Sequence, residues 1–510
     1  MIILNIRFYC LCLIMFLFIM NNDGYGLDMY DLYHLCKNNS PTLKLQNQTL
    51  KRKEGVLQSV KGYFDWTFTN QSSAGRSYRQ PSEQEKMLSD GSVGDVRSSL
   101  YSTSLGVLKP FKSGTIVNPT IGFNKSDAGL PHLDPMYNFD IGISFIQSLS
   151  RLKNSKNYSN QKAAELDYKS EKLVTEHLLS YQVYSVLVAY MDYNAAHNKH
   201  QIYSASLQKS NQFFLEMLEL IDADFRPKSD INQLEADLAE KEISLIYSEQ
   251  MIIEYKRALC QILGIGFDEF GQSDTINNIL PNDRHYMGVI STSNEKLISI
   301  AMNKRKDIQA ASLVIQSSEV LLESARRDLF PEFSLEGQYR IKGSEFGSSF
   351  AKTIRNDDSH VKDMGIILNL SLPFSDDVDR GKYRQSLSMK DQARINYENQ
   401  SNSIKLDVIT ARKNLIAANK SLEQIEKATD RYITVLENEK ARFTEGLITL
   451  TELLLLQDRL ILAELKLVEL NSEYIKSIIR FRYQLGILIP ERKFSRESLN
   501  EYFVSLPSFN

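Results

Sequence analysis

Histidine, cysteine and acidic residues are the side chains that could bind a metal or perform catalysis, and their spacing in this chain favours neither. Seven histidines are present, and none lies in an HExxH motif. His197 and His200 would share one face of a helix, but no third ligand accompanies them, so we interpret them as part of a solvated face. The segment "LGIGFDEFG" lacks GxGxxG spacing, and neither GxSxG nor a P-loop occurs. The sequence therefore predicts no enzyme, no metal site and no cofactor.

The overall composition excludes further classes of protein. The chain has 510 residues, of which 42% are hydrophobic and 24% charged, with a formal net charge of -3. These values do not indicate nucleic-acid binding, disorder or a collagen-like fibre. Residues 1–26 contain Arg7, an apolar run from Phe8 to Met20 and a small residue at Gly26, which is the arrangement of a cleaved secretory signal peptide. An uncleaved membrane anchor is the alternative, although the run is shorter than the ~20 residues that a span needs.

The exported chain contains two cysteines and no long apolar run. Past the signal peptide no stretch of 18 apolar residues occurs, so any entry into a membrane would use strands. Cys10 and Cys12 leave with the signal peptide, while Cys36 and Cys260 remain. We interpret the remaining pair as free and buried, with a disulfide in an oxidising compartment as the alternative.

The chain contains two copies of one plan. Residues 40–68 are similar to 305–335, and the helix predicted over 230–265 is similar to 452–487, because both end in Leu-Gly-Ile. Each copy has the order short helix, strand, loop, strand, long helix, turn and short helix. We therefore divide the chain into a first repeat, an equatorial segment, a second repeat and a C-terminal tail, at 27–265, 266–293, 294–490 and 491–510.

Two uninterrupted segments predict very long helices. Proline and glycine are absent from about Leu149 to Asp222 and from Lys382 to Glu445. Helices of roughly 70 and 65 residues would extend for ~100 Å. The flanking shorter helices sum to the same lengths, so we expect each long helix to run antiparallel to two short helices stacked end to end. The short helices are predicted over 27–62, 229–264, 294–328 and 449–488, and the tip turns over 222–230 and 443–452.

Four segments alternate apolar and polar residues and predict strands: one around Trp66, then 137–149, 333–342 and 366–372. Their length of about ten residues suits tilted membrane strands. Aromatic residues gather at the strand ends, as they do at membrane interfaces, although ordinary core residues are the alternative. These residues are Phe64, Trp66, Tyr137, Phe139 and Phe330.

A membrane sheet has to close on itself, and four strands are fewer than the ~8 that the smallest barrels have. We therefore expect copies of the chain to pool strands, twelve in the case of three copies. The insertion 71–136 is rich in Ser, Gly and Asp. We expect an outer-surface loop there, with an added hairpin inside it.

These features resemble the TolC family of outer-membrane efflux proteins over nearly all of residues 27–490. The resemblance rests on "RKDIQAA" followed by "LFPEFSLEGQY", on "NLSLPFSDDVDRGKYRQSL" and on "RFTEGLITLTELLLLQDRLILAE". It implies a mainly α fold with β: a homotrimer with a 12-stranded outer-membrane β-barrel, four strands per chain, continuous with a long periplasmic α-helical barrel. It also implies residence in the outer membrane of a Gram-negative bacterium, extending into the periplasm.

By the same resemblance, the protein would export small molecules when docked to a periplasmic adaptor protein and an inner-membrane pump. Because the chain has no nucleotide site, the pump would supply the energy. An outlet of type I protein secretion is the alternative within this architecture, and a periplasmic coiled-coil scaffold is the alternative from another class. The expected partners are thus a second and third copy, the adaptor, the pump and outer-membrane lipid, with no nucleic acid.

The resemblance also assigns residues to the periplasmic tip. Glu452 falls on the first acidic position of the ring around the entrance, with a helix N-terminal acid as the alternative. Asp230 matches a tip aspartate that links protomers, with a helix N-cap as the preferred interpretation. The arginine expected opposite would fall on Ile448, so Arg226 and Lys228 are the substitute cations.

Overall fold

The computed structural model describes residues 28–88, 94–130, 133–150, 155–223, 227–270, 292–347, 349–355, 360–372, 375–490 and 494–507. The signal peptide predicted at 1–26 and most of the equatorial segment lie outside these residues. The chain forms two compact units. The helical unit comprises the described residues up to Thr49 with those of Lys172–Ala310 and Glu398–Asn510, and the sheet unit comprises those of Leu50–Glu171 and Ala311–Tyr397. Within the described ranges, no helix is both long and apolar enough to cross a membrane.

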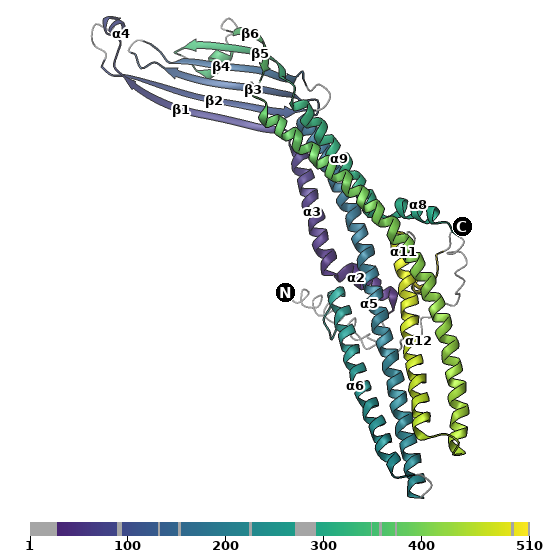
Figure 1. Ribbon diagram of the computed structural model, residues 1–510. Helices are drawn as coiled ribbons and strands as arrows, with labels where there is room; N and C mark the ends of the chain where they lie inside the picture. Colours follow the sequence, from purple (N-terminus) through teal and green to yellow (C-terminus); the bar gives the residue numbers. More distant parts are fainter. Residues whose placement is uncertain are drawn as a thin grey trace, which may run out of the picture. The chain divides into compact units, whose positions relative to one another are not determined.

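The sheet unit contains one antiparallel sheet of six strands in sequence order, β1-β2-β3-β4-β5-β6 (Figure 1). The predicted strands of the two repeats are β1, β4, β5 and β6. The expectation of four strands per chain was wrong, because the hairpin expected inside a surface loop pairs along its whole length with β1 and β4 and supplies β2 and β3. The strands are β1 (Thr67–Arg79), β2 (Val96–Pro110), β3 (Thr115–Asp127), β4 (Met136–Ser148), β5 (Glu332–Phe346) and β6 (His360–Ser371), with the short helices α4 (Glu83–Leu88) and α10 (Phe350–Arg355) between them.

The two faces of this sheet differ in polarity. Directly paired residues share a face, so the row Leu105, Ile121, Ile141 and Ile341 forms an apolar stripe across β2 to β5. The adjacent row on the opposite face is Gly106, Thr120, Gly142 and Arg340. The alternation predicted for separate segments therefore adds up to one apolar face and one polar face.

Glycines of β5 lie beneath aromatic rings of β4 on the apolar face. A Cβ atom added to Gly337 would lie 2.2 Å from the ring of Phe145, and one added to Gly343 would lie 2.7 Å from the ring of Phe139. The rings therefore occupy the space that side chains would fill, and they shield the backbone of β5.

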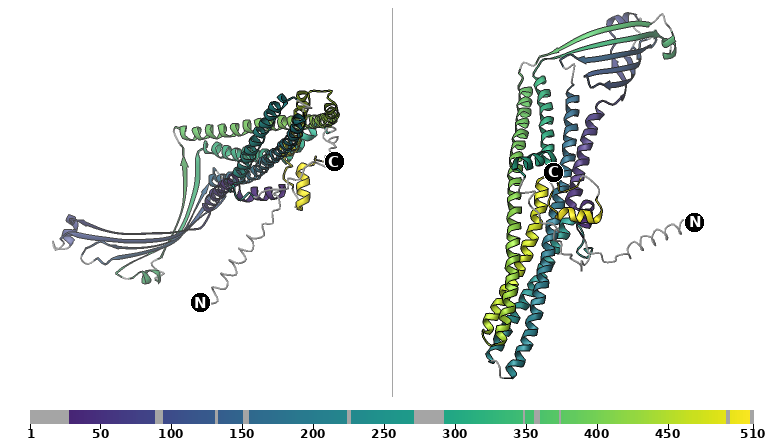
Figure 2. Two further views of the ribbon diagram at one scale, coloured as in Figure 1. Left: turned by 90° about the horizontal axis from the view of Figure 1, so that it is seen from below. Right: turned by 90° about the vertical axis from the view of Figure 1, so that its right-hand side faces the viewer.

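Two helices of 67 and 68 residues, α5 (Lys156–Asp222) and α11 (Asp377–Thr444), confirm the prediction from the proline- and glycine-free segments. In the helical unit α5 lies beside α6 (Ser229–Leu263) and α11 beside α12 (Leu450–Gln484), each partner having 35 residues (Figures 1 and 2). The other predicted short helices are each broken in two, after Asn39 and after Lys304. The pieces are α2 (Met29–Asn39), α3 (Pro41–Gly62), α8 (Asn294–Lys304) and α9 (Lys306–Asp328).

The second break is held by a buried ion pair. Arg305, between α8 and α9, has extended backbone, and its guanidinium binds Asp307 with Nη2–Oδ2 2.7 Å and Nε–Oδ1 3.1 Å. Its Nη1 donates to Gln484 Oε1 at 2.6 Å. His177 Nε2 lies 3.7 Å from Asp307. Burial raises the pKa of Asp307, but the hydrogen bonds from Arg305 and the charge of His177 outweigh it and lower that pKa below its usual value.

The main core of the helical unit joins α2, α5, α6 and α12 with the C-terminal helix α13 (Arg496–Val504). Cys36 and Cys260 both lie in this core and are free, as predicted. Burial raises the pKa of the Cys36 thiol to about 11. The C-terminal tail is thus part of the fold: Arg496 Nε lies 2.6 Å from Asp28 Oδ2, and the guanidinium of Arg482 lies 4.0 Å from the ring centroid of Tyr502.

Candidate functional site: the tip turns and an interhelical cavity

The two tip turns meet at one end of the helical unit. In the α11–α12 turn Gly446 has a φ of +76°, and the N–H of Leu447 donates to the carbonyl of Arg442 at 2.9 Å, which closes the end of α11. Gln233 of α6 and Thr451 of α12 are hydrogen-bonded through their side chains at 3.1 Å. A small apolar cluster packs beneath both turns, formed by Met217, Leu234, Phe443, Leu450, Leu453 and Leu454.

Glu452 is exposed and belongs to a capping box at the start of α12. Its Oε2 accepts hydrogen bonds from the N–H (2.8 Å) and the hydroxyl (3.0 Å) of Thr449, while its own N–H donates to Thr449 Oγ1 at 3.3 Å. These bonds lower the pKa of the Glu452 carboxyl below its usual value. The residue is therefore ionised at neutral pH, and its charge lies at a helix N-terminus, where the macrodipole favours it.

Asp230 is not the N-cap that we preferred. It is the second residue of α6, and its N–H donates to the carbonyl of Pro227 at 3.1 Å, so the helix begins one residue earlier. Lys228 occupies the cap position with helical backbone and makes no side-chain capping bond. Asp230 still lies in the first turn, where a carboxylate is favourable. Arg226 lies outside the described residues, and the role of Lys228 as a substitute cation stays a prediction.

The predicted interface aromatics divide into exposed and buried rings. Trp66 and Phe330 are each 65% exposed and lie just before β1 and β5. Phe64 and Phe139 are only 8% exposed, so they act as core residues within the sheet unit. Tyr137, at the start of β4, is half-buried, with its ring 5.0 Å from that of Phe350. The interface interpretation therefore rests on Trp66, Phe330 and Tyr137.

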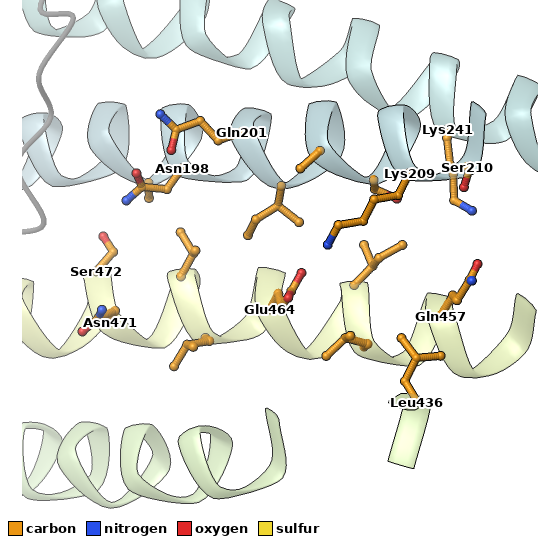
Figure 3. Close-up of a pocket in the computed structure, with 18 of the residues that line it drawn as sticks. Asn198, Gln201, Lys209, Ser210, Lys241, Leu436, Gln457, Glu464, Asn471 and Ser472 are labelled. Carbon is orange, nitrogen blue, oxygen red and sulfur yellow. The ribbon is translucent and has the colours of Figure 1, made fainter. Parts of the chain in front are cut away.

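A cavity of about 740 Å³ lies among α5, α6, α11 and α12, and no sequence pattern predicted it (Figure 3). Asn198, Gln201, Asn471 and Ser472 line it at one end, and Lys209, Lys241 and Gln457 lie toward the other. The amide side chains of Asn198, Gln201 and Asn471 lie on helices that are distant in sequence, so only the tertiary arrangement shows that they share a cavity.

Unpaired polar atoms face this cavity. The side-chain oxygens of Asn194 and Asn471 are buried and have no hydrogen-bond partner among the described residues. Lys241, only 7% exposed, binds Asp237 with Nζ–Oδ2 2.5 Å. Burial raises the pKa of the nearby Asp458, and the charge of Lys241 opposes that shift. A roomy cavity with unpaired acceptors is a site for ordered water.

The two histidines that share a helix face, His197 and His200, are half-buried, so their interpretation as part of a solvated face was wrong. His200 Nδ1 lies 2.9 Å from Ser248 Oγ, while burial lowers the pKa of His197. Across the part of the chain that the structure describes, no group of three or more His, Cys, Asp or Glu could hold a metal ion.

Comparison with known proteins identifies relatives by family and by fold. Residues 297–486 match the family "Outer membrane efflux protein". No curated protein sequence matches the chain. Three similar solved structures are outer-membrane proteins: CmeC of Campylobacter jejuni (13% identity, TM-score 0.65), VceC of Vibrio cholerae (16%, 0.63) and MtrE of Neisseria gonorrhoeae (13%, 0.62). The aligned regions cover 94%, 90% and 90% of this chain and 90%, 96% and 89% of those three chains, in the same order. The outer-membrane channel OprN is also similar, at 16% identity and a TM-score of 0.63, with 90% of this chain and 89% of that chain covered.

Proposed function

We propose that this chain, a member of the outer membrane efflux protein family through residues 297–486, is the outer-membrane export duct of a tripartite efflux system. It acts as a passive channel for small molecules and works as a homotrimer. A periplasmic adaptor and an inner-membrane pump supply the connection and the energy. The duct lies in the outer membrane and extends into the periplasm.

The apolar face of the sheet carries this proposal. Met364 and Ile366 on β6 are each 77% exposed, and Ile143 on β4 is 47% exposed. A single chain that leaves such a face in water would be prone to association. The face suits lipid, and the polar face on the other side, with Arg340 and Asp363 paired across β5 and β6, suits a watery lumen.

Membrane extraction tests the duct against the scaffold alternative. The duct should resist sodium carbonate extraction and dissolve in detergent as a trimer. Release as a water-soluble rod would refute it. Copurification then identifies the pump. A copurifying exporter of small molecules supports the efflux function, whereas an ABC transporter of a type I system would favour protein secretion instead.

The tip turns are the proposed entrance, with Glu452 on its rim. Glu452→Gln removes the charge, but glutamine also serves at this position of a capping box, so the start of α12 should be preserved. We expect lower cation selectivity and weaker cation block in planar-bilayer recordings. Glu423→Gln, an exposed glutamate of α11 paired with Lys427 at 2.6 Å, is the matched control and should leave both unchanged.

Comparing Glu452→Ala with Glu452→Gln separates the effect of the charge from that of the cap. Glu452→Ala removes both the charge and the capping bonds, so it should show the same altered selectivity and also a lower melting temperature. If Glu452→Gln conducts like the wild type while Glu452→Ala melts earlier, the residue is a cap alone and the entrance is lined by other groups.

A further inference from the structure

The hairpin β2–β3 spans the full height of the sheet. Its strands have 15 and 13 residues, and the other four have 12 to 15. It lies inside the sheet, between β1 and β4, and not at an edge. A hairpin that merely decorated an outer loop would leave β1 free to pair with β4.

The turn of this hairpin lies at the helix end of the sheet. The carbonyl of Lys112 accepts a hydrogen bond from the N–H of Ser155 at 3.4 Å, directly before α5. Lys112 Nζ also lies 5.7 Å from the ring centroid of Tyr158 in the first turn of α5. The insertion therefore runs from the loop end of the sheet down to the helices and back.

Both hairpin strands place their apolar and polar side chains on the same two faces as the neighbouring strands do. Leu105 and Ile121 continue the apolar row of β4 and β5, and Gly106 and Thr120 continue the polar row. Ile121 is 39% exposed, close to the 44% of its partner Ile141 on β4. Side chains on β2 and β3 are thus divided between the apolar face and the polar face of the sheet in the same way as those on β4.

The edges of the sheet are β1 and β6, and each has one side that no other strand of the described residues pairs with. In an antiparallel sheet with an even number of strands, the two edge strands run in opposite directions. The β1 edge of one copy therefore suits the β6 edge of the next, over 13 and 12 residues. Unpaired backbone groups in lipid are costly, so closure with further copies is required.

We infer that each chain contributes six strands to the membrane wall, so that a homotrimer closes a barrel of eighteen strands and not twelve. This inference rests on the proposed function. Because barrel diameter grows roughly linearly with strand number, the pore is about half again as wide as a twelve-stranded one. Barrels of this size hold an open aqueous channel.

Lipid-borne fluorescence quenching tests the inference. Single cysteines replace Ile121 and Thr120 on β3, and Ile141 and Ser144 on β4, in a background with Cys36→Ser and Cys260→Ser. Each variant is labelled with a small fluorophore and reconstituted in vesicles containing brominated phosphatidylcholine. We expect the label at Ile121 to be quenched as strongly as that at Ile141, and the labels at Thr120 and Ser144 to be quenched at least twofold less.

The outcomes separate the two proposals. If Ile141 is quenched but Ile121 is quenched no more than Thr120, the hairpin lies outside the wall and the inference fails while the duct stands. If Ile141 is not quenched either, the membrane placement itself fails. Native mass spectrometry of the detergent complex fixes the copy number: three copies support eighteen strands, and any other number overturns that count.

Discussion

The buried pair of Arg305 and Asp307 gives the most direct test of how the helical unit is held together. Asp307→Asn preserves the shape of the side chain and removes its charge. The side chains of the pair are only 8% and 13% exposed, so water cannot replace the lost partner. Leaving one buried charge without its partner costs about 3–5 kcal/mol. For comparison, an exposed pair on a helix such as Glu423 and Lys427 contributes about 0.3–0.5 kcal/mol.

Thermal unfolding of the purified protein in detergent, followed by circular dichroism at one fixed scan rate, measures the effect. We expect Asp307→Asn to lower the apparent melting temperature by about 3–5 °C, because the unfolding entropy of a 510-residue chain is about 1 kcal/mol per degree. The matched control is Glu423→Gln, which makes the same chemical change at an exposed pair and should shift the midpoint by about 1 °C or less.

A double variant checks the reason for the loss. Arg305→Met combined with Asp307→Asn removes both charges, so it should melt above Asp307→Asn alone. The interpretation is refuted if Asp307→Asn melts with the wild type. It is also refuted if the double variant is the less stable of the two, because the cost would then come from lost hydrogen bonds and not from an unpaired charge.

Three further predictions concern glycine, histidine and cysteine. Gly486 has a φ of +72°, and a Cβ there would lie 2.8 Å from a backbone nitrogen, whereas a Cβ on Gly381 in α11 would meet open space. Gly486→Ala should therefore lower the melting temperature. Gly381→Ala should leave the melting temperature unchanged or raise it, because alanine stabilises a helix interior by ~0.5–1 kcal/mol relative to glycine. Burial lowers the pKa of His177, so folding disfavours its protonated form. The melting midpoint should therefore fall as the pH decreases below about 6.5, and it should fall less steeply in His177→Gln. Equal slopes of midpoint against pH in the two proteins would show that His177 does not cause the dependence. Cys36, with its pKa raised to about 11, should resist maleimide at neutral pH in the native protein and react after unfolding; fast native labelling would contradict its burial.

Local sequence signals predicted the elements well. The lack of proline and glycine between Leu149 and Asp222 was sufficient for α5, because nothing in that segment interrupts the hydrogen-bond ladder. The break before Pro41 also had a local signal, since proline favours the first position of a helix. The break at Arg305 had none. It depends on Asp307, on the glutamine at the end of α12 and on the close approach of Gly486, which are tertiary contacts.

Partners distant in sequence explain the other differences. The segments of β2 and β3 read as a hairpin, but only their pairing with β1 and β4 makes them part of the sheet. Asp230 missed the cap position because the carbonyl of Pro227 binds its N–H, a detail of turn geometry that residue type does not encode. The family resemblance was confirmed, while the roles of the tip residues stay predictions.

The fit of Phe139 and Phe145 over Gly343 and Gly337 has a consequence for how the chain finds its fold. The connections β2–β3 and β3–β4 comprise only residues 111–114 and 128–135, and β1–β2 and β5–β6 are joined by residues 80–95 and 347–359, so all four pairings are local in sequence. Strands β4 and β5 are separated by residues 149–331, and no turn aligns them. A slip by one residue would seat the rings against Glu336 or Lys342 and not over a glycine. The two glycines therefore favour the correct register of β4 against β5 in the slow, long-range step that joins the two halves of the sheet.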